Sequence, residues 1–206
     1  MAKRKLQPVI VPEEVPLKLD LGCGPNKLEG FTGVDIRPFP GVDRLSDLTK
    51  IPWVLNHAEE GGRIIPGDVP LGDESVSEVY CSHFVEHLTG PQRVEFFNEL
   101  YRVLKTGAQA RIICPNWSHE RSYGDPTHQW PPVCSWTFFY LNKAWRDANA
   151  PHVGYTCDFD HAIVGLHDPN DQWVSLRNME TKIIMMSRNV NTTTDVIATL
   201  TKRPAV

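Results

Sequence analysis

The sequence has no long apolar run, no CxxC pair and no excess of positive charge, and each absence narrows the range of functions. Nowhere do about 18 apolar residues follow one another, so no transmembrane helix is predicted. The 5 cysteines are widely spaced and odd in number, which favours reduced thiols in a cytoplasmic protein, most of them packed in the core. A formal net charge of -4 gives no basic field that would attract a polyanion over the whole surface.

Internal repeats and low-complexity tracts are absent as well. With 206 residues and 41% hydrophobic composition the chain can bury a sizeable core, and we expect one domain over residues 1–206. The basic cluster MAKRK lacks the apolar segment of a signal peptide. We therefore expect residues 1–14 to form a flexible N-terminus.

Strand-like and helix-like segments alternate through the first two thirds of the chain. Strands are expected at Leu17 to Leu21, in FTGVDI up to Asp35, more weakly in VDRLSDL up to Asp47, in SEVYCSHF and in AQARIICP. A helix should start with Gly90 as N-cap and Pro91 as its first residue and stop at Gly107. Residues 51–70 show no steady period and are expected to form an irregular insertion around a short helix. This order of segments favours a mostly parallel sheet with helices on its faces.

The last third of the chain has a different character. Residues 118–136 are a polar, aromatic and proline-rich loop that follows a predicted strand, so we expect it on the substrate side of the sheet. A helix is expected over residues 137–148. Three strand-like runs end the chain, HAIVGLH, TKIIMMSR and TTDVIATLTK, and the last two are expected to pair antiparallel.

The segment LDLGCGPNKLEGFTGVDI places two acid-ended strands around a glycine turn. Gly22 and Gly24 have no Cβ, so the backbone can turn tightly and a ligand can lie against it. The carboxylates of Asp20, Asp35 and Asp47 are all expected at the carboxyl edge of the sheet, where ligands bind in open α/β folds. Carboxylates accept hydrogen bonds, so this edge suits a ligand that carries an ammonium group, a ribose diol and an adenine amine.

A dinucleotide is a poorer match to the same turn. The usual G-x-G-x-x-G motif opens a full helix whose N-terminal amides hold a pyrophosphate. Here Lys27 stands at the third glycine position and Pro25 removes an amide donor. Only 9 residues separate Gly24 from Val34, so a helix of one or two turns at most could fit.

These residues resemble the cofactor loop of class I S-adenosylmethionine-dependent methyltransferases, in particular a small branch that reads LGCG followed by KLxGF and VDI. LGDESVSEVYCSHFVEHL and ELYRVLKTGAQARIICP are similar to the fourth strand, the next helix and the fifth strand of that family. The resemblance implies a Rossmann-like α/β fold with a mostly parallel seven-stranded sheet, helices on both faces and an antiparallel C-terminal strand pair. It also implies S-adenosyl-L-methionine as the cofactor.

Carried over position by position, the resemblance implies that Gly22, Cys23 and Gly24 line the methionine end of the cofactor. Asp35 would hold the ribose hydroxyls, and Asp47 would lie near the adenine with Leu48 beside it. The complete set of expected cofactor contacts is Asp20, Gly22, Cys23, Gly24, Asp35, Ile36, Asp47, Leu48, Ser82 and His83.

The segment HFVEH, from His83 to His87, allows several interpretations. It fits the H-x-x-E-H pattern of a zinc peptidase, but that pattern needs a helix, and this segment lies at the exit of a predicted strand. The histidines and Glu86 could instead contact substrate above the methyl group, or Glu86 and His87 could simply cap the following helix. A similar E-x-x-E-H segment, completed by a later histidine such as His119 or His128, binds a divalent ion in some small-RNA 2′-O-methyltransferases. No metal ligand is assigned, and metal binding stays open.

Methyl transfer to a hydroxyl requires removal of a proton, and His83 or His128 could accept it. We take His83, His128 and Asp125 as the candidate catalytic residues, with a small-molecule, sugar or glycan oxygen as the acceptor. The chain lacks the [N/D]-P-P-[Y/F] segment and the Pro-Cys nucleophile of DNA methyltransferases, and it has no aromatic stripes interleaved with basic residues. Nucleic acid is therefore a less favoured partner, and no membrane partner is expected. The alternatives are a non-catalytic binding protein and a metal-assisted RNA 2′-O-methyltransferase.

Overall fold

The computed structural model describes residues 16–58, 64–65, 70–167 and 178–205. The predicted flexible N-terminus, residues 1–14, and parts of the predicted insertion lie outside the described residues.

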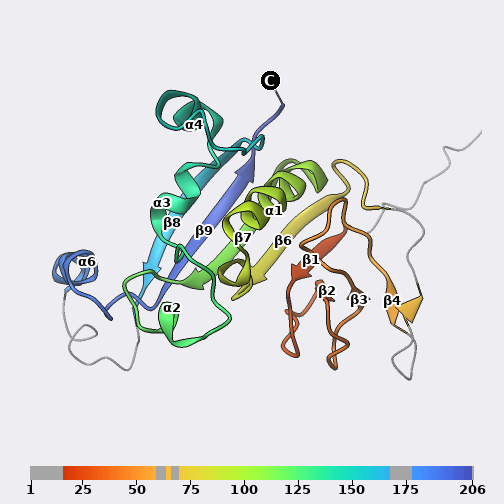
Figure 1. Cartoon of the computed structure of the whole chain (residues 1–206), viewed down its shortest axis with the longest axis horizontal. Helices are drawn as coiled ribbons and strands as arrows, with labels where there is room; N and C mark the ends of the chain where they lie inside the picture. Colours follow the sequence, from red (N-terminus) through yellow and green to blue (C-terminus); the bar gives the residue numbers. More distant parts are fainter. Residues whose placement is uncertain (1–15, 59–63, 66–69, 168–177, 206) are drawn as a thin grey trace, which may run out of the picture.

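Seven strands form one sheet in the order β3-β2-β1-β6-β7-β9-β8 (Figure 1). They are β1 (Lys18–Leu21), β2 (Thr32–Asp35), β3 (Arg44–Leu45), β6 (Val76–Ser82), β7 (Leu104–Pro115), β8 (Phe159–Leu166) and β9 (Asp195–Lys202). The strands from β3 to β7 in this order pair in parallel, and β9 runs antiparallel to both of its neighbours. The predicted Rossmann-like α/β fold with a mostly parallel seven-stranded sheet is confirmed.

The connection from β1 to β2 contains no helix. The backbone N–H groups of Gly22 and Cys23 both donate to the carbonyl of Val34, at 2.8 and 3.2 Å. Because the chain turns back directly onto the neighbouring strand, the carboxyl ends of β1 and β2 lie beside each other. The order of strands reverses between β1 and β6, and at such a point an open α/β sheet offers a binding crevice.

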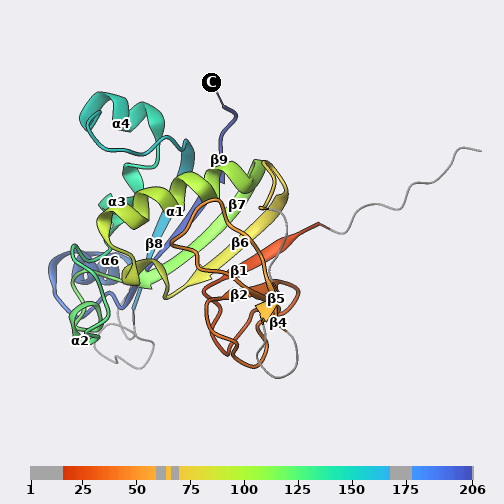
Figure 2. The ribbon, with the colours of Figure 1, turned by 45° about the vertical axis from the view of Figure 1, so that its right-hand side comes forward.

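One face of the sheet is covered by α1 (Gly90–Val103) and α3 (Ser135–Phe139), while α4 (Lys143–Asn149) lies beyond the ends of β8 and β9 (Figure 2). The helix α1 buries Phe96, Phe97 and Leu100 in a core shared with the strands. Its N-cap is Thr89 rather than the predicted Gly90, because the N–H of Thr89 donates to Oε1 of Gln92. The helix ends at Val103, and Gly107, predicted to end it, lies in β7.

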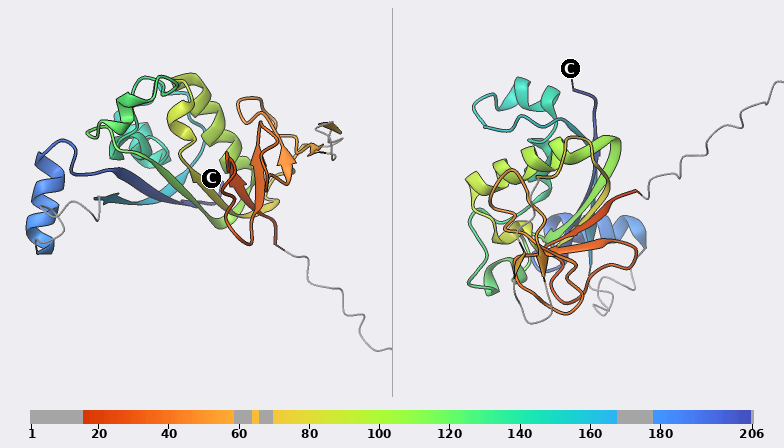
Figure 3. Two further views of the ribbon diagram at one scale, coloured as in Figure 1. Left: turned by 90° about the horizontal axis from the view of Figure 1, so that it is seen from below. Right: turned by 90° about the vertical axis from the view of Figure 1, so that its right-hand side faces the viewer.

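The expectation of helices on both faces holds only in part. The β1–β2 and β2–β3 connections contain no helix, and in the left view of Figure 3 α1 and the green and teal helices that follow β7 lie above the sheet, whereas α6 lies beyond one end of it. On the opposite face β6 and β7 carry half-buried or exposed polar side chains, among them Glu78, Tyr80 and Arg111. A short β1–β2 connection has no room for the helix that would cover this face.

The helix predicted over residues 137–148 is instead two helices, α3 and α4. Asn142 lies between them, and its side-chain oxygen accepts a hydrogen bond of 3.0 Å from the backbone N–H of Trp145. A side chain that satisfies a free N–H in this way is an N-cap, so a new helix begins after it.

The run TKIIMMSR is helical, not the strand that was predicted. It lies in α6 (Met179–Arg188), whose N-cap Asn178 accepts a hydrogen bond of 2.9 Å from the N–H of Thr181. The antiparallel C-terminal pair is consequently formed by β8 and β9. In Figure 1 the helix α6 lies at one end of these two strands.

The predicted insertion at residues 51–70 contains a small antiparallel pair, β4 (His57–Ala58) and β5 (Ile64–Ile65). The short helix expected there does not occur in its described residues, and residues 59–63 and 66–69 lie outside them. Trp53 fastens the start of this segment, since its side chain is fully buried and its indole N–H donates to the carbonyl of Leu48. None of the helices in the described part of the chain has the length and apolar character needed to cross a membrane.

Candidate active site

The glycine turn after β1 is joined directly to the acid at the end of β2. The N–H of Gly24 donates to Oδ2 of Asp35, and the N–H of Arg37 donates to Oδ1, both at 2.9 Å. Gly24 has a φ of +53°, and a Cβ added to it would meet nothing within 4 Å, so open space lies above the turn. Each carboxylate oxygen of Asp35 can accept a second hydrogen bond, so this oriented side chain has acceptor capacity left for a ligand.

The pKa of the Cys23 thiol reflects the burial and the negative charge of the turn. The pKa of this thiol is raised to about 12, first by burial and then by the negative charges of Asp20 and Asp35. The contribution of these two carboxylates, unlike that of burial, is a negative potential, which opposes the binding of a pyrophosphate and favours a cation.

Asp20 and Leu48 are less accessible than the sequence suggests. Asp20 is 2% exposed, and its Oδ2 accepts a hydrogen bond of 2.7 Å from the N–H of Leu28, so it supports the turn from below. Burial is the main reason why the pKa of this carboxyl is raised. The side chain of Leu48 is 4% exposed and belongs to the hydrophobic core.

Ile36 and Asp47 can be reached from solvent. Ile36 is 61% exposed beside Asp35. Asp47 is half-buried, and its Oδ1 accepts hydrogen bonds from the N–H and the hydroxyl of Thr49 at 3.1 and 2.6 Å. These bonds hold the pKa of Asp47 below its usual range against the opposing effect of burial, so the side chain stays ionised at neutral pH.

The end of β6 lies against the glycine turn. A Cβ added to Gly22 would come within 2.6 Å of the Phe84 ring, so the turn and residues 82–84 pack in direct contact. Ser82 is the last residue of β6, and His83 follows it with a φ of 54°, in the left-handed region that few residues other than glycine adopt. This backbone conformation turns the chain from β6 into the short helix η1 (Val85–His87).

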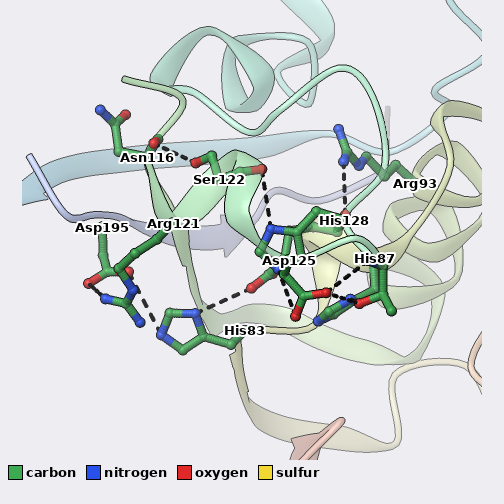
Figure 4. Close-up of polar contacts among 11 residues, drawn as sticks. His83, His87, Arg93, Asn116, Arg121, Ser122, Asp125, His128 and Asp195 are labelled. Atoms are coloured by element: carbon green, nitrogen blue, oxygen red, sulfur yellow. Dashed lines mark hydrogen bonds and ion pairs between the residues drawn. The ribbon is translucent and has the colours of Figure 1, made fainter. Parts of the chain in front are cut away.

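His83 lies between two carboxylates. Its Nδ1 is 3.2 Å from Oε1 of Glu86, and its Nε2 is 3.8 Å from Oδ1 of Asp195 (Figure 4). An ionised carboxylate can only accept, so Nδ1 carries the hydrogen and donates it to Glu86. The hydrogen bond to Glu86 is the largest influence on the pKa of His83, which is raised. In its neutral form this histidine therefore has a free lone pair on Nε2.

The loop after β7 is fastened to η1 by Arg93, a buried side chain of α1. Its guanidinium donates to the carbonyls of Val85, Gln129 and Pro131 at 3.2, 3.2 and 2.6 Å. The side chain is 3% exposed. With the carbonyl of Glu86 at 3.5 Å, four carbonyls from two segments share one cation. If the loop moved away from η1, two of these acceptors would be lost and buried N–H groups would be left without partners.

A cavity of about 780 Å³ lies between η1 and the loop, which contains the short helix α2 (Arg121–Gly124). It is lined by His83, Glu86, His87, Pro115, Glu120, Arg121, Gly124, Asp125, Pro126 and His128. The structure thus brings the three predicted catalytic residues to one cavity. Seven of these ten residues have ionisable side chains, and the other three are two prolines and a glycine.

Some residues of this region carry no individual signal in the sequence. Arg121 lies in the predicted substrate-side loop, but the sequence does not single it out from its neighbours. Asp195 begins β9, far from His83 in the chain, and its Oδ2 is 3.4 Å from Nη1 of Arg121. Only the pairing of β9 with β7 brings this carboxylate to the edge where β6 ends.

Comparisons with known proteins agree with this geometry. A family described as a methyltransferase domain matches residues 19–112, from β1 into β7. The match identifies this part of the chain as a methyltransferase domain, in agreement with the resemblance to class I S-adenosylmethionine-dependent methyltransferases. A methyltransferase domain of this kind uses S-adenosyl-L-methionine as its cofactor. No curated protein matches the sequence.

Solved structures share the methyltransferase fold at low sequence identity. A SAM-dependent methyltransferase from Archaeoglobus fulgidus is 21% identical, with a TM-score of 0.59 over 92% of this chain and 87% of the other. A putative methyltransferase in complex with the Trm112 activator, from Haloferax volcanii, is 15% identical, with a TM-score of 0.52 over 94% and 85%. A SAM-dependent methyltransferase from Methanosarcina mazei is 15% identical, with a TM-score of 0.51 over 94% and 95%.

The glycine turn of this methyltransferase fits its cationic cofactor. The open space above Gly24 and the acceptor capacity of Asp35 would receive a ligand rich in donors. The negative potential that raises the pKa of Cys23 would stabilise an ammonium or a sulfonium.

Proposed function

We propose that this methyltransferase holds its cofactor between the glycine turn and the end of β6. Gly22, Cys23 and Gly24 would contact the methionine part, and Asp35 would accept hydrogen bonds from the ribose hydroxyls. Asp47, together with Ile36, would border the adenine. Asp20 and Leu48 are assigned a supporting role in this arrangement, because both are almost completely buried.

The acceptor in this proposal is a hydroxyl group of a polar small molecule, a sugar or a glycan. The observation that carries it is the lining of the cavity, in which histidines, carboxylates and an arginine predominate. Such a surface can hydrogen-bond a hydroxylated molecule at several points, whereas an apolar acceptor would leave buried polar groups without partners. The five free thiols agree with a cytoplasmic setting for this activity.

We assign the removal of the hydroxyl proton of the acceptor to His83. The bound cofactor supplies an electrophilic methyl carbon on a positively charged sulfur. Held between the glycine turn and the end of β6, it would donate this methyl group to the acceptor oxygen and leave as S-adenosylhomocysteine with the electron pair of the carbon–sulfur bond. The hydroxyl proton passes to Nε2 of His83, where Glu86 and Asp195 stabilise the imidazolium.

His128 and Asp125 would orient the acceptor. Nδ1 of His128 is 3.3 Å from the carbonyl of Ser122, which fixes the ring, and its Nε2 is 3.9 Å from Oδ2 of Asp125. The Thr127 hydroxyl donates to Asp125 at 2.6 Å and holds the pKa of this carboxyl below its usual range. Both side chains lie at the cavity wall formed by the loop (Figure 4).

The experiment that tests this proposal compares His83→Gln with the exposed control His152→Gln. Transfer of a labelled methyl group to a panel of polyols, sugars and oligosaccharides is measured, and amines, thiols and apolar alcohols serve as comparison acceptors. We expect His83→Gln to lower kcat about 100- to 10,000-fold, a loss much larger than any change in its affinity for S-adenosylhomocysteine, which His83 is also predicted to contact.

Two results would contradict separate parts of the proposal. Full activity of His83→Gln on a hydroxyl acceptor would show that His83 does not accept the hydroxyl proton. Transfer to amines or thiols without any transfer to hydroxyls would remove oxygen as the acceptor atom.

A further inference from the structure

Three side chains on one side of the cavity converge in the way that ligands of a metal ion do. Glu86, His87 and His128 each offer one ligand atom, and these atoms lie within 4.8 Å of one another. Glu86 and His87 come from η1, and His128 comes from the loop that Arg93 fastens to η1. In Figure 4 His87 and His128 lie together at the same side of the cavity.

The Glu86 carboxylate gives independent evidence for a cation. The residue is 4% exposed, and its Oε1 accepts the hydrogen of His83. Its Oε2 is buried and has no hydrogen-bond partner in the described part of the chain. A buried carboxylate oxygen without a partner is costly, and a bound cation would remove that cost.

The hydrogen bonds of the two histidines define which nitrogen each has available. The Thr127 hydroxyl donates its hydrogen to Asp125, so Nδ1 of His87, 2.9 Å from that hydroxyl oxygen, must be the donor between them. Nδ1 of His128 faces the carbonyl of Ser122 and must also be a donor. Both neutral rings therefore keep a lone pair on Nε2, and ring N–H groups bound to oxygen are typical of histidines that ligate metals.

We propose that Glu86, His87 and His128 bind a divalent first-row transition-metal ion, through Oε2 of the carboxylate and Nε2 of each histidine. Two imidazoles with one carboxylate suit Mn²⁺, Fe²⁺, Co²⁺ or Zn²⁺ better than Mg²⁺ or Ca²⁺, which prefer oxygen ligands. Two ligands at about 2.1 Å from one ion are at most about 4.2 Å apart, so binding must draw the widest pair closer by about half an ångström.

The remaining coordination positions of the ion would face the cavity. An acceptor hydroxyl placed there becomes more acidic, so the site would assist the proton transfer assigned to His83. The proposal concerns binding of the ion and holds whether or not the acceptor is a hydroxylated molecule.

The test uses the full chain after treatment with a chelator. Co²⁺ is titrated and followed by its visible absorption, and Mn²⁺ is titrated and followed by electron paramagnetic resonance of the free ion, with Mg²⁺ as the comparison ion. We expect one ion per chain, with Mg²⁺ bound at least about 10-fold more weakly than Mn²⁺. His87→Asn and Glu86→Gln should each weaken binding at least about 100-fold, while the exposed control His152→Asn should leave it unchanged.

Because Glu86 is buried, its variant could lose structure, and the exposed position of the His87 ring at the cavity makes His87→Asn the decisive variant. Thermal unfolding of each variant identifies any loss of fold. Absence of Co²⁺ and Mn²⁺ binding, or equal binding by the native chain and His87→Asn, would overturn the metal site. Metal binding without transfer to any hydroxyl acceptor would leave the site intact and contradict the proposed function alone.

Discussion

Gly24 donates its backbone N–H to the Asp35 carboxylate across 2.9 Å, which joins the turn after β1 to the end of β2. The two residues are separated by the whole connection, yet they form one surface. The hydrogen bond orients the carboxylate, and the absence of a side chain at Gly24 leaves open space beside it. A turn that would be too short to hold a pyrophosphate is thus well suited to present an acid to a ribose.

Asp35→Asn should weaken binding of S-adenosylhomocysteine about 10- to 100-fold, since hydrogen bonds to an ionised carboxylate contribute about 1.5–3 kcal/mol. Calorimetric titration measures the loss. Asp147→Asn is the control, because Asp147 is an exposed residue of α4 that pairs with Lys143. Equal affinities of the native chain and Asp35→Asn, at equal thermal stability, would show that the ribose does not bind at Asp35.

Gly22→Ala and Gly24→Ala form a matched pair that separates crowding from backbone strain. Both glycines have positive φ, 69° and 53°, so alanine should cost about 1–3 kcal/mol at either position. At Gly22 the new Cβ would also overlap the Phe84 ring, whose nearest atom is at 2.6 Å, and overpacking adds about 1–3 kcal/mol. Urea unfolding should therefore show a larger loss for Gly22→Ala, and equal losses would contradict the contact.

Local sequence patterns were sufficient to predict the first half of the sheet and the turn at its centre. The roles of Gly22, Gly24 and Asp35 depend on the conformation of a turn and on the end of a strand. Both features can be recognised from neighbouring residues in the sequence. The same patterns wrongly predict a strand for TKIIMMSR, which the structure places in α6 with Asn178 as its N-cap. Intrinsic preference alone does not distinguish a short helix from a strand in such a run.

The acceptor side could be predicted only in part. His83, Asp125 and His128 stand out as titratable residues in segments that follow strands, and all three line one cavity. Asp195 carries no such signal, because its place beside His83 depends on the antiparallel pairing of β9 with β7. The role of Arg93 could not be predicted either, because its partners in the loop are backbone carbonyls, which every residue type has.

Cys23 should react slowly with iodoacetamide at pH 8. A rise in the thiol pKa from its usual 9.0 to about 12 lowers the thiolate fraction at pH 8 about 1,000-fold, and the rate should increase with pH up to that value. Mass spectrometry of the peptide that contains Cys23 measures the rate. The urea-unfolded chain is the control and should react as an ordinary thiol, while Asp35→Asn should react faster than the native chain. A native rate equal to the unfolded rate would contradict the raised pKa, and equal rates of the native chain and Asp35→Asn would contradict the negative potential at the turn.

Arg93→Lys should loosen the loop that closes the cavity and destabilise the chain. A lysine is a compact charge and cannot reproduce the planar set of donors that reaches Val85, Gln129 and Pro131, so buried carbonyls lose their partner. We expect a loss of about 2–4 kcal/mol in the free energy of unfolding. Faster hydrogen exchange should accompany this loss at the amide of Gln129, which donates to the carbonyl of Glu86.

The matched control is Arg111→Lys in β7. There the side chain is exposed, and the change in the free energy of unfolding should stay within about 0.5 kcal/mol. Equal effects of the two substitutions would mean that Arg93 does not hold the loop against η1, and the geometry of the cavity would then need another cause.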